Sequence, residues 1–146
     1  MSEWRRNLVT DDAGVARIVR ECRRIAVLGM KTERQGAQPA FYVPAYMADA
    51  GYDIVPVPVY YPEVTVILGR PVYRRVADVR PPADLIDVFR RPADIPPHVP
   101  DILAGRPRAA WFQLGIRHDQ AAEALARAGI QVVQDRCLLV EHRRLG

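Results

Sequence analysis

Five short apolar runs recur along the chain and restrict its fold more than any other feature. Turn-forming or polar residues follow each run, and the runs are residues 24–29, 52–58, 84–89, 108–114 and 130–134. Runs of this length and composition are typical of strands buried on both faces of a parallel sheet. Pro56 lies within the second run and cannot donate a ladder hydrogen bond, so we expect that strand at a sheet edge or close to its own end.

Helical segments separate these runs. Residues 11–23, 39–50 and 119–128 carry apolar side chains at helical spacing, and a Pro-rich stretch delays another helix to a start as late as His98. A long aromatic loop, 59–68, and a short extended segment are expected between the second and third strands. Strand–helix–strand units of this length force parallel pairing with right-handed crossovers. The sequence therefore predicts an α/β fold: a doubly wound, mainly parallel five-stranded Rossmann-like sheet with helices on both faces, in three layers.

Length and composition predict one domain. The chain has 146 residues, 49% of them hydrophobic and 26% charged, which is ordinary for a single globular domain. We expect one domain over residues 1–146, with residues 1–23 as a helical N-terminal extension packed on it. No apolar stretch resembles a signal peptide or a membrane span, so we expect a cytoplasmic protein without membrane contact.

The charge distribution favours a small anionic ligand over nucleic acid. The formal net charge is +4, and the cations are twenty arginines and the single lysine Lys31. The arginines are scattered, which is typical of a solvated surface and argues against a nucleic-acid site. An RNA-binding or interaction module stays open as an alternative, and it predicts salt-sensitive affinity for nucleic acid.

The loop after the first predicted strand is a candidate phosphate site. Ligands of open parallel sheets bind beyond the carboxyl ends of the strands, where a helix N-terminus attracts anions. An ordinary strand-to-helix turn is the alternative, because the loop matches neither a P-loop nor a dinucleotide fingerprint. The candidate ligand-binding residues here are Gly29, Met30, Lys31, Thr32 and, at the helix start, Ala40.

The end of the second strand argues against a nicotinamide cofactor. A dinucleotide oxidoreductase places an acidic residue there for the ribose hydroxyls, whereas this chain has Val57, Pro58 and, after Val59, Tyr60. These residues could hold an adenine ring or line a pantetheine tunnel. The alternative is that Tyr60 and Tyr61 only cover the sheet edge.

The third and fourth strand ends supply further candidates. Arg90 and Arg91 have guanidinium groups suited to phosphate, although surface arginine is the alternative. A glycine after the fourth strand permits close backbone approach. The candidates at these two ends are Phe89, Arg90, Arg91, Gln113, Leu114 and Gly115.

The fifth strand ends at Asp135, Arg136 and Cys137. Arg136 and Cys137 are candidate ligand contacts, with a structural ion pair at Asp135 and Arg136 as the alternative. Cys137 is a reactive thiol if a helix begins there, and otherwise a buried structural cysteine. The histidines show no metal spacing and no serine partner in a nucleophile elbow, so we expect no catalytic residue and no metal.

These blocks together resemble the small stand-alone bacterial CoA-binding proteins, which are similar to the CoA-binding domain of the succinyl-CoA synthetase alpha subunit. The resemblance runs from about residue 24 to 145 and is carried by residues 25–29, 50–57, 67–69, 84–92, 111–117, 132–137 and 141–145. It implies coenzyme A or acyl-CoA as the ligand, with the diphosphate on the Gly29 loop and contacts from the turns at Val57–Pro58, Phe89–Arg90 and Leu114–Gly115.

The same resemblance bears on activity and partners. Many relatives have a serine and a shorter spacer in the first loop, where this chain has residues 31–36. The resemblance does not extend to the domain of the synthetase that carries its phosphohistidine. We therefore expect non-catalytic binding of CoA or acyl-CoA, alone, as a homodimer or within a larger acyl-CoA enzyme complex. The alternative is an NAD(P)- or other nucleotide-binding module or enzyme subunit.

Overall fold

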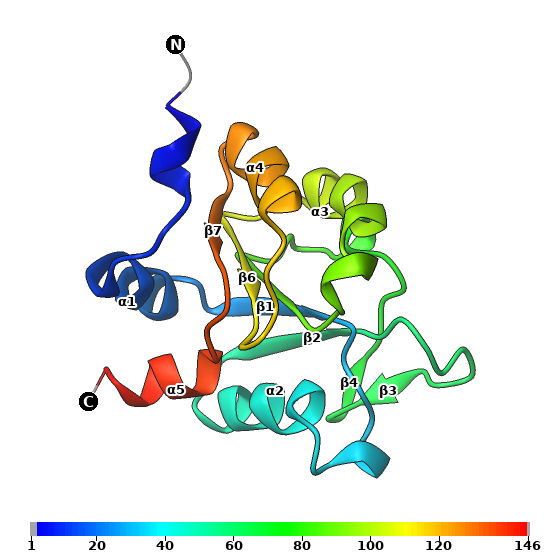
Figure 1. Cartoon of the computed structure of the whole chain (residues 1–146). Coiled ribbons are helices and arrows are strands. Elements are labelled where there is room, and N and C mark those ends of the chain that lie inside the picture. Colours follow the sequence, from blue (N-terminus) through cyan, green and yellow to red (C-terminus); the bar gives the residue numbers. More distant parts are fainter. Residues whose placement is uncertain (1–2, 146) are drawn as a thin grey trace.

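The computed structural model describes residues 3–145 and contains one five-stranded parallel sheet (Figure 1). Its order is β2-β1-β5-β6-β7, and every neighbouring pair is parallel. The predicted fold class is confirmed. The strands are β1 (Arg24–Leu28), β2 (Asp53–Val57), β5 (Leu85–Val88), β6 (Ala109–Phe112) and β7 (Gln131–Val133).

Helices cover both faces of this sheet and make three layers (Figure 1). On one face lie α1 (Asp12–Glu21), α2 (Pro39–Asp49) and α5 (Leu138–Arg143). On the other lie the 3-10 helix η1 (Trp4–Asn7), α3 (Val99–Gly105) and α4 (Asp119–Arg127). None of the helices described is long and apolar enough to cross a membrane.

Strand β1 shows why the core strands lack polar alternation. Ile25 and Val27 are buried against the α1, α2 and α5 layer, while Ala26 and Leu28 are buried against the η1, α3 and α4 layer. Because successive side chains of a strand point to opposite faces, a strand covered on both sides needs apolar residues throughout. Such a strand therefore reads as a continuous apolar run.

Strand β2 lies at the sheet edge, as Pro56 predicted. The Pro56 carbonyl accepts a hydrogen bond from the Tyr73 amide at 2.9 Å, so the following segment covers this edge. That segment forms a small hairpin of β3 (Val66–Ile67) and β4 (Arg70–Pro71), which differs from the expected loop and extended segment because pairing begins before Gly69.

The Pro-rich segment after β5 forms two successive 3-10 turns. They are η4 (Pro92–Asp94) and η5 (Pro96–His98), whereas a further 3-10 turn, η3 (Val76–Asp78), precedes β5. Helix α3 begins at Val99, one residue after the latest predicted start. Proline is tolerated in a first turn because the amide there has no helical partner, so the two prolines of η5 form a tight turn and Pro100 enters the first turn of α3.

Candidate functional site

Two adjoining cavities lie at the carboxyl ends of the strands, and we call them together the carboxyl-end groove. The large cavity measures about 450 Å³ and the small cavity about 230 Å³. Four residues line both cavities and mark the junction between them: Lys31, Phe89, Arg90 and Arg91. The groove has the size expected of a small-molecule site.

Gly29 brings three strand ends together beneath this groove. Its φ is +87°, and a Cβ at this position would lie 2.4 Å from the carbonyl oxygen of Phe89. Its amide donates to the Val57 carbonyl at 2.9 Å. Only glycine satisfies both the positive φ and the close approach without strain, so this position fixes the β1 turn against the end of β5.

The other predicted residues of the first loop differ in position: one lies on the groove, one is mostly buried, and one caps a short helix. Lys31 lines the groove, and within residues 3–145 its ammonium group has no ion pair or hydrogen bond. Met30 is buried at 1% exposure, although it borders the small cavity. Thr32 does not line the groove, because its hydroxyl caps the 3-10 helix η2 (Glu33–Gln35) by accepting from the Arg34 amide and binding Gln35.

At the end of β2, one of the three predicted residues, Tyr60, lines the groove. Val57 is fully buried, and neither it nor Pro58 lines either cavity. Tyr60 lines the small cavity and is 59% exposed, with Val59 and Tyr61 beside it. The aromatic side chains singled out in the sequence therefore lie at the small cavity, whereas Val57 and Pro58 do not.

Arg90 is the junction cation with the most polar contacts among the described residues. Its side chain is 14% exposed, and its Nε lies 3.2 Å from the Nε2 of His98. Its terminal nitrogens lie 3.4 Å from the Tyr60 hydroxyl and 3.7 Å from Asp94, and the hydrogen bond from Arg90 lowers the pKa of the Tyr60 phenol. Arg91 is exposed and pairs with Asp94 at 2.9 Å.

The end of β6 forms the far wall of the large cavity. Leu114, which is 68% exposed, and the buried Gln113 both line this cavity, and the Gln113 side chain accepts a hydrogen bond from the Leu138 amide at 3.1 Å. Gly115 has φ +83°, and its amide donates to Asp135 at 2.6 Å. Cys137 is half-buried, lines the same cavity and stands directly before α5.

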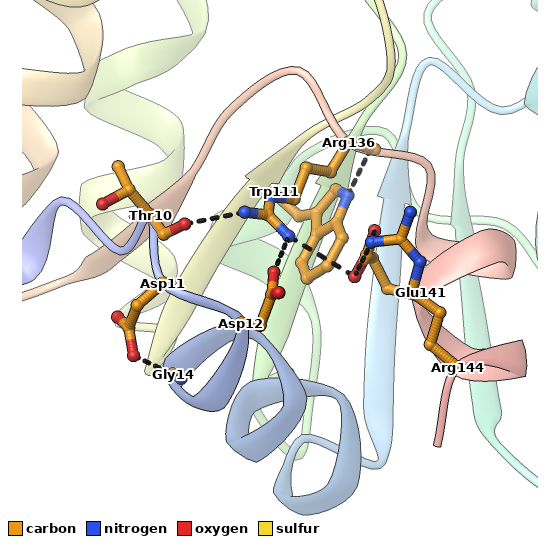
Figure 2. A network of polar contacts seen from close by, with 8 residues as sticks. All are labelled: Thr10, Asp11, Asp12, Gly14, Trp111, Arg136, Glu141 and Arg144. Carbon is orange, nitrogen blue, oxygen red and sulfur yellow. Dashed lines mark hydrogen bonds and ion pairs between the residues drawn. The ribbon is translucent and has the colours of Figure 1, made fainter. Parts of the chain in front are cut away.

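Arg136 lies outside the groove, in the network shown in Figure 2. Its guanidinium donates to the Thr10 carbonyl at 2.7 Å and contacts Asp12 at 3.1 Å and Glu141 at 3.5 Å. Its own carbonyl accepts from the Trp111 indole at 2.7 Å. Arg136 therefore connects the N-terminal segment with α5 and has the structural role that was the alternative to ligand binding. Its ion-pair partners are Asp12 and Glu141 rather than Asp135.

Ala40, the predicted residue at the start of α2, lines the large cavity, and several groove residues were absent from the sequence predictions. They lie next to predicted positions, at the start of α2 or after β5 and β6: Gln38, Pro39, Tyr42, Pro92 and Ile116. These residues could have been predicted from their neighbours, because a helix that begins at the sheet edge places its whole first turn there. Among the described residues no cluster of His, Cys, Asp or Glu could hold a metal ion.

The groove lies where a doubly wound fold binds nucleotides, which makes the chain a nucleotide-binding type of α/β domain by its fold. In the order β2-β1-β5, the chain leaves β1 in one direction to β2 and places β5 on the other side, so the crossover direction reverses between β1 and β5. Such a reversal is where doubly wound folds bind nucleotides. Gly29 and Phe89 meet at this reversal, and the groove opens above them.

The chain belongs to the CoA binding domain family, which it matches over residues 23–143. This confirms the family resemblance seen in the sequence. A Thermus thermophilus protein of known structure is 39% identical, has a TM-score of 0.85, and covers 94% of this chain and 100% of its own. The Bacillus subtilis protein YneT, which is uncharacterised, is 29% identical over 130 residues, covering 89% of this chain and 93% of its own.

A larger enzyme contains a similar fold. The dinucleotide-forming acetyl-coenzyme A synthetase 1 of Ca. Korarchaeum cryptofilum aligns with 75% of this chain and 25% of its own length. The TM-score is 0.64 and the identity is 13%, so this likeness concerns the fold alone. Part of this acetyl-coenzyme A synthetase therefore shares the fold of the chain.

Proposed function

We propose that this protein binds coenzyme A or an acyl-CoA in the carboxyl-end groove and does not transform it. Membership of the CoA binding domain family supports the ligand class, and the position of the groove at the crossover reversal supports the place. The observation that carries the proposal is the junction, where Lys31, Arg90 and Arg91 meet between an aromatic cavity and a larger one.

The two cavities match the two halves of the ligand. CoA joins a phosphorylated nucleotide to an uncharged pantetheine arm through a diphosphate. The small cavity offers Tyr60 and Tyr61 as ring faces for the base, and the junction cations face the diphosphate. The large cavity, with Leu114 and Ile116 on its far wall, receives the arm and any acyl group.

The groove offers less to a nicotinamide dinucleotide. At the carboxyl end of β2, where an acidic residue would hold the ribose, Val57 is buried and Pro58 follows. The acidic residue of this strand, Asp53, stands at the opposite end and forms ion pairs with Arg24 and Arg70. We therefore favour CoA over NAD.

Calorimetric titration tests this proposal. We expect CoA and acetyl-CoA to bind wild-type protein at one site per chain, with NAD at least tenfold weaker. Lys31→Ala removes one charge-assisted contact, for which a loss of about 1.5–3 kcal/mol, or roughly ten- to a hundredfold in affinity, is expected.

Arg20→Ala is the matched control, because Arg20 is an exposed cation on α1, away from the groove. Its CoA affinity should equal that of wild type. Absence of CoA binding at millimolar ligand would contradict the proposal, and an equal loss in both variants would show that only net charge matters.

A further inference from the structure

His98 stands behind the groove rather than in it. It is the last residue of η5, its side chain is half-buried, and it lines neither cavity. Its Nε2 lies 3.2 Å from the Nε of Arg90. A guanidinium nitrogen can only donate, so the imidazole must accept at Nε2, which requires a neutral ring with its proton on Nδ1.

The contact with His98 fixes the orientation of Arg90. It is the shortest of the three polar contacts of this guanidinium, the others being Tyr60 at 3.4 Å and Asp94 at 3.7 Å. His98 holds the Nε–H, while the two terminal nitrogens face Tyr60 and Asp94. The guanidinium carbon lies over the Tyr60 ring, 5.4 Å from its centre, so Arg90 also contacts the aromatic wall of the small cavity.

We propose that His98 is a positioning residue for anion binding: its neutral imidazole holds Arg90 at the junction, so the groove binds its polyanionic ligand more tightly when His98 is deprotonated. This inference rests on the proposed function, since it assigns a role within CoA binding. It adds pH control to a site whose lining residues do not include the controlling group.

The surroundings of His98 determine when it titrates. The charged groups that face it are Arg90 from the end of β5, Asp94 from η4 and Asp101 from α3. Burial and the Arg90 charge lower the pKa of His98 below its ordinary value, outweighing the two carboxylates that raise it. The Asp101 carboxylate also accepts hydrogen bonds from the amides of Val76 and Ala77.

Protonation then has one main structural consequence. The imidazolium cannot accept from Arg90, and two cations would face each other across 3.2 Å. The Arg90 guanidinium must therefore move away from His98, and it can still pair with Asp94 or be solvated by water. His98 does not line the groove. The positive charge that it gains therefore lies farther from the ligand than the guanidinium charge that is lost from the junction when Arg90 moves.

The test compares CoA affinity, measured calorimetrically between pH 5.0 and 7.5, in wild type, His98→Gln and His98→Ala. Glutamine retains an acceptor but does not titrate. We expect wild-type affinity to fall at acidic pH about tenfold more than that of His98→Gln, the size of one lost charge-assisted contact. His98→Ala should bind about tenfold more weakly than wild type at pH 7.5, with a profile parallel to that of His98→Gln.

Two controls isolate the effect of His98. The CoA 3′-phosphate titrates near pH 6, as phosphomonoesters do, but it contributes equally to every variant and cancels in the comparison. His142→Gln removes a histidine that contacts Tyr46, away from the groove, and should keep the wild-type profile. Circular dichroism at each pH confirms that every variant is folded.

The outcomes are distinct. Wild type and His98→Gln with the same profile, or wild type binding more tightly at pH 5, would overturn the positioning role while leaving CoA binding intact. No CoA binding by wild type at pH 7.5 would contradict the proposed function and this inference with it.

Discussion

Asp87 should make the stability of this protein depend on pH in an unusual direction. It lies on β5, the central strand, paired in register with Val27 and Trp111, and it is 1% exposed. Neither carboxylate oxygen has a hydrogen-bond partner among the described residues. Burial raises the pKa of Asp87 well above its ordinary value, because the charged form cannot be solvated there.

The magnitude follows from linkage. Above a pH of about 3.9 the unfolded chain releases the Asp87 proton while the native protein keeps it, so stability falls as pH rises. Each pH unit costs about 1.4 kcal/mol until the native pKa is passed, after which the difference is constant. Asp87→Asn has nearly the same shape but does not titrate, so the substitution should become progressively more stabilising relative to wild type.

Urea unfolding followed by tryptophan fluorescence measures this at pH 4.5, 5.0 and 5.5. We expect the free energy of unfolding of Asp87→Asn minus that of wild type to increase by about 1.4 kcal/mol across this interval. Asp49→Asn, at the exposed end of α2, is the control and should keep a constant difference within about 0.5 kcal/mol. A constant difference for Asp87→Asn as well would refute a buried, protonated carboxyl group.

Three further predictions concern single residues. Gly29→Ala should destabilise the fold by about 2 kcal/mol or more in urea, because of its positive φ and the 2.4 Å approach to Phe89; an unchanged midpoint would contradict this close packing. Arg136→Ala should increase amide exchange near Thr10 with CoA affinity unchanged, whereas a tenfold loss of affinity would return Arg136 to the binding site. Burial raises the pKa of the Cys22 thiol to about 11, so native protein at pH 8 should react with a thiol reagent at Cys137 alone, and at both cysteines once unfolded.

The strand ends were predictable from the sequence because parallel strands place their carboxyl ends at one edge. Once β1, β5 and β6 are recognised as apolar runs, their following residues must converge. Gly29, Arg90 and Leu114 meet in the groove for this reason. No knowledge of side-chain direction was needed.

Side-chain direction is what the sequence could not provide. Arg136 follows a strand as Arg90 does, but its partner Thr10 is 126 residues away, on a segment whose position depends on the whole fold. Likewise, nothing in the sequence connects His98 with Arg90, because η4 and η5 turn the chain back between them. For Thr32 a local signal existed: the spacing to Gln35 is that of a capping box, which occupies the hydroxyl.

The most direct test of CoA binding in the carboxyl-end groove is a titration of ¹⁵N-labelled protein with CoA, followed by the backbone amide resonances. We predict saturable shifts concentrated at Gly29, Lys31, Arg90 and Gly115, with the amides of η1 and α1 unaffected. Shifts confined to the N-terminal segment around Arg136, or no shifts at millimolar CoA, would contradict the account.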